Sequence, residues 1–155
     1  MIENKIEIKE KGIYRGREYV IVFFRGHFNA YGETLLKQHY SEKIQFYSLD
    51  ENSIFETKML KAPEDFIEAH GGITFGASTL KHFDSDKLNT TKLFYGIDFA
   101  HFGDFNERLP QFGGKVWKQE EVKEEVFRLI DGILLYESEV AVYEINEFHN
   151  IVKTY

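Results

Sequence analysis

The sequence predicts one α+β domain, in which a mixed or antiparallel sheet packs against a long helix in the C-terminal half. Three observations support this prediction. Segments typical of strands and of helices do not alternate regularly along the 155 residues. Residues 119–133 carry apolar side chains at helical spacing. No stretch rich in Pro, Gly or Ser divides residues 1–155, so we expect a single compact domain.

The first two predicted elements are strands. Residues 4–10 alternate polar and apolar side chains, which is the period of a half-buried strand, and Lys11-Gly12 favours a turn after it. Residues 18–24 form an unbroken β-branched and aromatic run, which predicts a strand buried on both faces that ends at Gly26-His27. The aromatic side chains predicted to lie in the core here, with base stacking as the less favoured alternative, are Tyr14, Tyr19, Phe23, Phe24 and Phe28.

The middle of the chain predicts shorter elements. Residues 33–42 can form a short helix with its apolar side chains on one side, and residues 43–48 a short strand. Pro63, followed by two acidic residues, is typical of a helix start, and Gly71-Gly72 ends that helix. The remaining elements are predicted strands at residues 73–75, 92–99 and 139–145, with the long helix at 119–133 before the last of them.

Composition narrows the class of protein. The chain has no cysteine, so it forms neither a disulfide framework nor a thiolate metal site. Together with the lack of an N-terminal apolar segment, this favours a cytoplasmic location. No apolar run approaches the length of a membrane span, so no membrane partner is expected. The net charge of −7 argues against binding to duplex nucleic acid, which requires a basic face.

Three segments combine histidine, glycine and polar side chains: residues 26–32, 70–76 and 96–104. Each lies at the end of a predicted strand or helix, where a rigid element presents a loop and functional residues commonly collect. Glycine allows close approach of a ligand to the backbone. Histidine titrates near neutral pH and can act as an acid, a base or a metal ligand. We therefore expect a polar site built from these segments.

The predicted site assigns chemistry to two histidines and two aspartates. The candidate acid/base groups, which are also the candidate ligands of a divalent metal ion, are His70, His101, Asp98 and Asp104. We expect His70 and His101 to lie close enough to share a ligand, and His27 to join them in one pocket. The backbone amides of Gly71 and Gly72, with Thr74, would hold an oxyanion. The candidate ligand-binding residues are thus His27, Tyr31, Gly71, Gly72 and Thr74.

The same residues also have structural interpretations. A strand-end histidine such as His27 can simply make one hydrogen bond, Gly71-Gly72 can end a helix, and Asp104 can cap a turn. Recurrence favours the functional interpretation, because three of the six histidines stand in such glycine-containing segments. The other three histidines, which lack such surroundings and are predicted to lie on the surface, are His39, His82 and His149.

The three segments resemble a family of small bacteriophage and prophage proteins of undefined function. The family pattern is a Gly-His-Pro-like segment with a nearby Tyr-Gly, then His-Gly-Gly-(Leu/Ile)-Thr-(Phe/Tyr), then Gly-(Ile/Phe)-Asp-x-Ala-His-x-Gly-Asp, then a Glu-rich helix. In this chain the pattern corresponds to Gly26-His27 with Tyr31-Gly32, to residues 70–75, to residues 96–104 and to the helix beginning near Gln119. The chain departs from it at Phe28, where Pro is expected, and after Ile133. The resemblance implies a phage origin, hence the host cytoplasm, and a shared polar site without a known reaction.

Three hypotheses for function follow. In the first, the chain is a phosphoesterase-type hydrolase of a phosphorylated small molecule such as a nucleotide signal. In the second, it is an anti-defence protein that sequesters such a signal without turnover, commonly as a homo-oligomer. The partner in both is a small anionic ligand or nucleotide. In the third, it is a structural or interaction domain. The hydrolase is favoured because three histidines and two aspartates are more titratable groups than binding requires.

Overall fold

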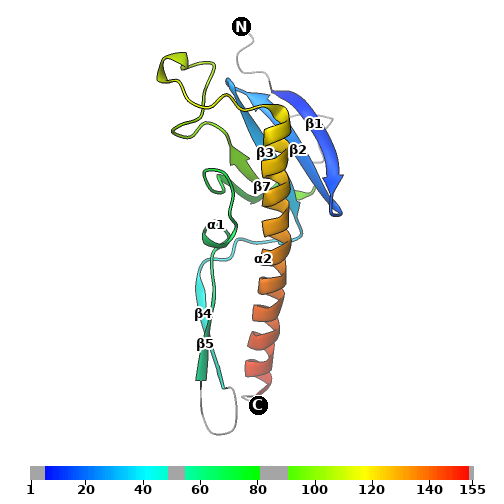
Figure 1. The fold of residues 1–155 in the computed structure, drawn as a ribbon. Helices are drawn as coiled ribbons and strands as arrows, with labels where there is room; N and C mark the ends of the chain where they lie inside the picture. Colours follow the sequence, from blue (N-terminus) through cyan, green and yellow to red (C-terminus); the bar gives the residue numbers. More distant parts are fainter. Residues whose placement is uncertain (1–5, 49–54, 81–90, 154–155) are drawn as a thin grey trace.

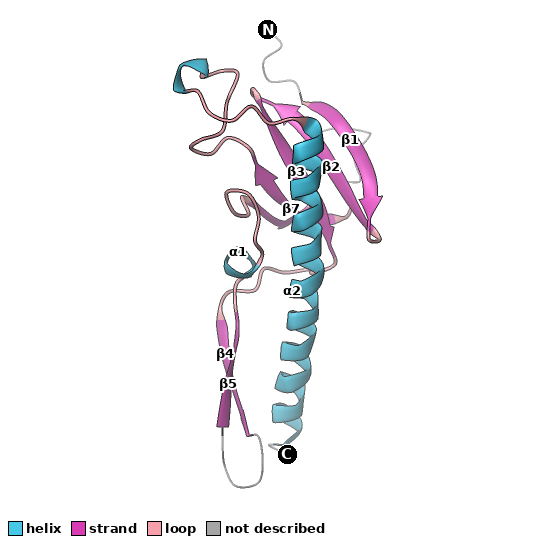
Figure 2. Cartoon of the chain, viewed as in Figure 1, coloured by secondary structure: helices cyan, strands magenta, loops and turns pink. Residues whose placement is uncertain are grey.

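A five-stranded antiparallel sheet packs against one long helix, α2, in the computed structural model (Figures 1 and 2). The structure describes residues 6–48, 55–80 and 91–153. The sheet order is β1-β2-β3-β7-β6, and the elements are β1 (Glu7–Tyr14), β2 (Arg17–Phe24), β3 (His27–Thr34), β6 (Phe75–Ser78), β7 (Leu93–Asp98) and α2 (Gln119–Lys153). The predicted α+β class, with its sheet against a long helix, is confirmed.

A separate two-stranded ribbon lies beside the C-terminal part of α2 (Figure 1). Its strands, β4 (Lys43–Ser48) and β5 (Phe55–Leu60), pair antiparallel. The strand at 43–48 was predicted and β5 was not. The chain then forms α1 (Pro63–Phe66), which starts at the predicted proline but ends after one turn, before Gly71-Gly72. A 3-10 turn (Pro110–Phe112) lies in the long loop before α2.

Two hairpin turns set the register of the first three strands. The predicted turn at Lys11-Gly12 is wrong, because these residues pair within β1 and the chain reverses at Arg15-Gly16. Arg15 and Gly16 have φ angles of 50° and 79°, and Arg25 and Gly26 have 56° and 85°. Positive φ at both central residues matches the right-handed twist of the flanking strands, which makes this the preferred two-residue hairpin turn.

Two further predicted elements are wrong. Residues 33–42 do not form a helix, because Glu33 and Thr34 continue β3 and pair with Phe94 and Leu93 of β7. Residues 139–145 do not form a strand, because α2 continues through them to Lys153. Three side chains at helical spacing keep one face of this part of α2 buried: Tyr136, Val140 and Tyr143.

The core has two layers, one on each face of the sheet. Tyr19 and Ile21 of β2 pack toward α2 with Val126, Leu129 and Ile130, whereas other β2 side chains pack on the far face. The far-face cluster consists of Val20, Val22, Tyr31, Leu80 and Phe94. The predicted burial of this strand on both faces is confirmed at its centre, since residues 19–22 are each at most 5% exposed.

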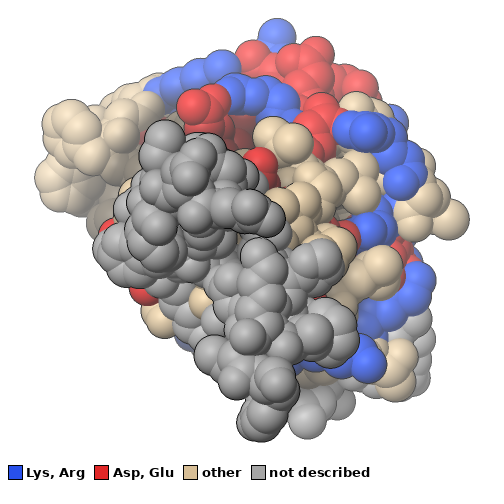
Figure 3. Space-filling view, turned by 90° about the horizontal axis from the view of Figure 1, so that it is seen from below, with Lys and Arg blue, Asp and Glu red and all other residues tan. Residues whose placement is uncertain are grey.

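No helix within the described residues is apolar over a stretch long enough to cross a membrane. Seen along α2, the basic side chains of the described surface lie among acidic and uncharged ones (Figure 3). The absence of duplex nucleic acid binding stays a prediction.

Candidate functional site

Three of the four candidate catalytic residues meet where two loops touch. His70 lies in the segment between α1 and β6, and His101 and Asp104 lie in the loop that follows β7. One potential ligand atom from each residue lies within 4.8 Å of the others. The imidazole centroids of His70 and His101 are 5.6 Å apart at a steep angle. The predicted proximity of these two histidines is confirmed.

Asp104 is the centre of this cluster, and its side chain is only 3% exposed. Its carboxylate accepts hydrogen bonds from His70 Nε2 at 2.8 Å, from Trp117 Nε1 at 2.8 Å and from the His101 backbone amide at 3.0 Å. Burial alone would raise the pKa of Asp104, but the bonds from these three donors outweigh burial and lower it. Asp104 is therefore a carboxylate at neutral pH, so the proton of its hydrogen bond with His70 lies on Nε2.

Aromatic rings hold the His70 imidazole in place. The ring stacks on Phe99 with centroids 5.1 Å apart and 12° between planes, and it meets Trp117 edge-on at 4.7 Å. Phe99 and Trp117 are themselves 4.8 Å apart. The sequence analysis missed both residues as parts of the site. No motif or spacing links Trp117 to Asp104, because their contact depends on the path of the loop between them.

His101 lies between two carboxylates. Its Nδ1 atom is 3.3 Å from Asp98 Oδ1 and 3.8 Å from Asp104 Oδ2. This nitrogen is buried and, within the described part of the chain, makes no hydrogen bond. The buried Oδ1 of Asn29, which stands opposite Asp98 in the β3–β7 ladder, also lacks a partner there. These two buried atoms near Asp98 are the polar groups of this region that a bound water molecule or a polar ligand would satisfy.

Of the two glycines, Gly71 leaves room for the ring of His101 and Gly72 does not contact it. Gly71 has a φ of +67°, and a Cβ atom there would overlap the His101 ring. Gly72 has a φ of +81°, but a Cβ atom on it would meet nothing within 4 Å. The predicted role of the Gly72 amide as an oxyanion donor is wrong, because that amide donates to Ala69 O at 3.0 Å. The Thr74 amide is likewise engaged, donating to Gly96 O at 2.9 Å.

Gly71→Ala is expected to displace the imidazole of His101, whereas Gly72→Ala is expected to leave it in place. Both substitutions put alanine at positive φ and should cost about 1–2 kcal/mol of folding free energy. Only the first adds an atom where the ring lies. NMR of the histidine ring signals separates the two effects. Equal shifts of the His101 signals in both proteins, or no shift in either, would contradict this packing.

The other predicted ligand-binding residues lie elsewhere. His27 does not join His70 and His101: its ring lines a separate pocket, where Nδ1 contacts Phe28 O at 3.0 Å. Tyr31 is 4% exposed in the far-face core, where its ring meets Phe75 edge-on. The expected convergence of three histidines is therefore wrong: His27 lines a pocket with Phe105 and Glu107 of the loop after β7, whereas His70 and His101 meet at Asp104. His39 is exposed as predicted. His82 and the side chain of His149 lie outside the described residues.

A cavity of about 420 Å³ opens beside the cluster. His101, Asp104 and Asn106 supply its polar side chains, and Phe102, Leu109 and Phe112 supply most of its apolar lining. No lysine or arginine lines it. The cavity is of the size that small-molecule sites commonly have.

No known protein-family model matches the chain, and comparison with curated proteins and with solved structures likewise gives no match. Any function must therefore be argued from the geometry of the cluster and its cavities.

Proposed function

We propose that this chain is a small hydrolase of a phosphorylated small molecule and that His70, His101 and Asp104 bind a divalent metal ion at its reaction centre. The observation that carries the proposal is the meeting of three ligand atoms within 4.8 Å, beside a cavity that two of the three residues line. Three protein ligands leave coordination positions open for water and substrate. This is typical of catalytic rather than structural metal sites.

Charge supports a metal ion in this position. The cavity has a carboxylate in its wall and no lysine or arginine to meet the charge of a phosphate group. An anionic substrate would be repelled there unless a cation were bound close by. A divalent ion on the cluster would neutralise phosphate oxygens and lower the pKa of a bound water molecule.

The residues present fit such an ion. The Nδ1 atom of His101 makes no hydrogen bond among the described residues and faces Asp104, which is already a carboxylate at neutral pH. Trp117 Nε1 and the His101 amide hold that carboxylate in a fixed orientation, as supporting hydrogen bonds do in metal sites. His70 Nε2 would give up the proton that it now donates to Asp104. Metal affinity should therefore fall as the pH drops and the histidines become protonated.

Asp98 is assigned the proton-accepting role. It lies outside the three-residue cluster, is 30% exposed and stands 3.3 Å from His101 Nδ1. In hydrolysis a water oxygen bonds to phosphorus, the ester P–O bond breaks, and the leaving oxygen takes up a proton. A carboxylate beside the cluster can accept the proton that the attacking water loses.

Incubation with a panel of cyclic and linear nucleotides and simple phosphate esters tests the proposal. We expect release of hydrolysed product with Mn²⁺ or Mg²⁺ and none with a chelator. Asp98→Asn should reduce turnover by about 10²–10⁴-fold, the effect of losing an acid/base group. Asp65→Asn, a matched change at an exposed residue of α1, should have no effect.

Recovery of an intact bound compound after long incubation with metal would contradict hydrolysis and support the sequestering alternative. Absence of binding by every member of the panel would contradict both and leave the structural alternative. In that case alanine at His70 or His101 would only lower stability.

A further inference from the structure

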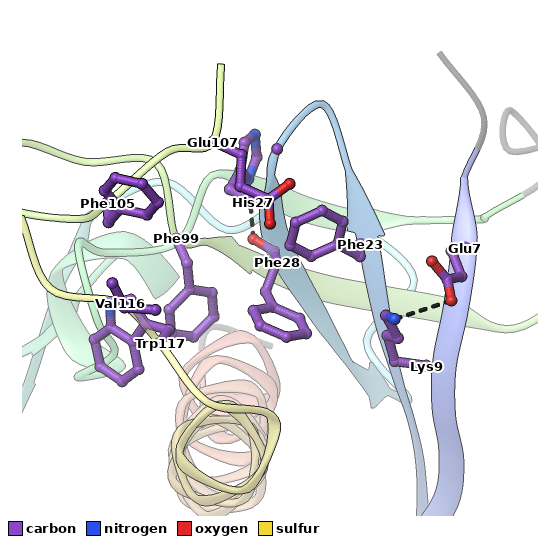
Figure 4. A pocket seen from close by; sticks show the side chains of 11 residues that line it. Glu7, Lys9, Phe23, His27, Phe28, Phe99, Phe105, Glu107, Val116 and Trp117 are labelled. Atoms are coloured by element: carbon purple, nitrogen blue, oxygen red, sulfur yellow. Dashed lines mark hydrogen bonds and ion pairs between the residues drawn. The ribbon is translucent and has the colours of Figure 1, made fainter. Parts of the chain in front are cut away.

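A second cavity, of about 490 Å³, lies at the end of the sheet and is lined mainly by aromatic rings (Figure 4). We call it the aromatic pocket, and its rings are Phe23, Phe28, Phe99, Phe105 and Trp117. His27, Glu107, Lys9 and Glu7 supply its polar and charged side chains. The sequence analysis predicted Phe23 and Phe28 to be core residues, but both are only half-buried.

Contacts within the protein hold the walls of the pocket in place. Phe23 and Phe28 pack edge-to-face at 5.1 Å on the sheet side, and Phe99 and Trp117 form a similar pair on the loop side. The Phe99 amide donates to Phe28 O at 3.0 Å, which ties the two sides together. A preformed cavity that combines apolar rings with polar groups is a common form of a small-molecule site.

Gly26 fixes the rim of the pocket. The Glu107 amide donates to Gly26 O at 3.1 Å, which holds the loop against the β2–β3 turn. Gly26 has a φ of +85°, and a Cβ atom there would collide with Asn106 and Arg108. The loop can approach this closely only because residue 26 is glycine. Glu107 is thereby held at the mouth of the pocket beside His27 (Figure 4).

The charges of the pocket do not suit a phosphate group. Its lining carries two carboxylates and one ammonium group, and Lys9 is already paired with Glu7 at 2.9 Å. The excess negative charge disfavours an anion. It favours a neutral planar group whose N–H donors can reach Glu107, while its faces lie against aromatic rings.

We infer that the aromatic pocket binds the heteroaromatic base of a nucleoside. This deepens the proposed function, on which it rests for the link to phosphate, by making the substrate a nucleotide. The pocket and the metal-binding cluster are neighbours, because His70 packs against Phe99 and Trp117, which also line the pocket. The base would be held at the aromatic pocket and the phosphate at the cluster, so each cavity would receive the group that its charge suits.

Trp117 makes the inference directly measurable. It is the single tryptophan of the chain and lines the pocket, so a bound base should quench its fluorescence. We expect adenosine or guanosine to quench the wild-type protein saturably, and ribose 5-phosphate to have no effect. Phe105→Ala should weaken nucleoside binding about 5- to 150-fold, the loss expected from one base–aromatic stack. Ile13→Ala is the control, since this exposed apolar side chain of β1 lines neither cavity.

Other results would overturn the inference. Nucleosides could fail to quench wild-type Trp117, or Phe105→Ala and Ile13→Ala could bind them equally well. Should Phe105→Ala not fold, Glu107→Lys on the exposed rim replaces it, with weaker binding again expected. Failure of the proposed function gives a different pattern: nucleosides bind, but no nucleotide is hydrolysed in the presence of metal. Hydrolysis restricted to phosphate esters without a base would contradict the pocket inference alone.

Discussion

Replacing Asp104 with asparagine is expected to lower the free energy of unfolding by about 1–3 kcal/mol and to abolish turnover. Three donors converge on this buried carboxylate, from His70, Trp117 and the His101 backbone. An asparagine side chain offers only one acceptor oxygen and turns an NH₂ group toward the remaining donors. A buried donor left without an acceptor costs about that much. Urea unfolding measures the loss, and Asp65→Asn at an exposed position should show almost none.

The pH dependence of stability gives Asp104 a separate signature. Its pKa is lowered in the folded state, so the folded protein releases this proton more readily than the unfolded chain. Its contribution is therefore fully present above the ordinary aspartate pKa of about 3.9 and is lost as the pH falls below that value. Acid unfolding of Asp104→Asn should lack this part of the pH dependence. Parallel acid unfolding curves for the two proteins would contradict the assignment.

Glu137→Ala is expected to cause the largest loss of stability, about 3 kcal/mol. Glu137 binds both ends of the Arg17 guanidinium, at 2.6 and 2.7 Å, and accepts hydrogen bonds from the Thr34 hydroxyl and the Leu35 amide. The side chains of Arg17 and Glu137 are 12% and 14% exposed. Removing Glu137 leaves the Arg17 charge buried without a partner, which typically costs about 3–5 kcal/mol. Because both side chains still contact some water, we expect a cost at the low end of this range.

Two comparisons separate this pair from an ordinary surface ion pair. Arg128→Ala breaks the exposed contact with Glu125 and should cost less than about 1 kcal/mol. Arg17→Met combined with Glu137→Leu should recover much of the lost stability, because neither charge is then buried alone. Thermal or urea unfolding measures both. A loss at Glu137→Ala no larger than at Arg128→Ala would contradict the account.

The sequence predicts those elements whose local pattern agrees with their packing. The strand at 18–24 and the start of α2 follow from unbroken apolar or helical spacing. Residues 139–145 contain a short apolar run at 140–143 that is also compatible with a strand, but Val140 and Tyr143 stand at helical spacing and pack into the core, so the segment is helical. Residues 27–32 have the composition of a loop. They form a strand because β2 and β7 satisfy their backbone on both sides.

The candidate site could be predicted only in part. His70, His101 and Asp104 follow from glycine-flanked motifs, and the structure brings them together. The contribution of Trp117 depends on the backbone bonds between residues 103–105 and Lys115, which no local pattern reveals. His27 stands in a glycine-containing segment like those of His70 and His101, but it lies at the start of β3 and lines the aromatic pocket instead of the cluster.

Calorimetric titration with Mn²⁺ near neutral pH tests the central claim, that His70, His101 and Asp104 form a metal site, most directly. The wild-type protein should bind about one ion per chain. His101→Ala should lose more than about 100-fold in affinity, beyond the 10–100-fold typical of residues that only support a metal ligand. His39→Ala, a matched change at an exposed histidine, should bind like the wild type. Absence of binding by the folded wild type, or equal binding by the His101 and His39 variants, would contradict the account.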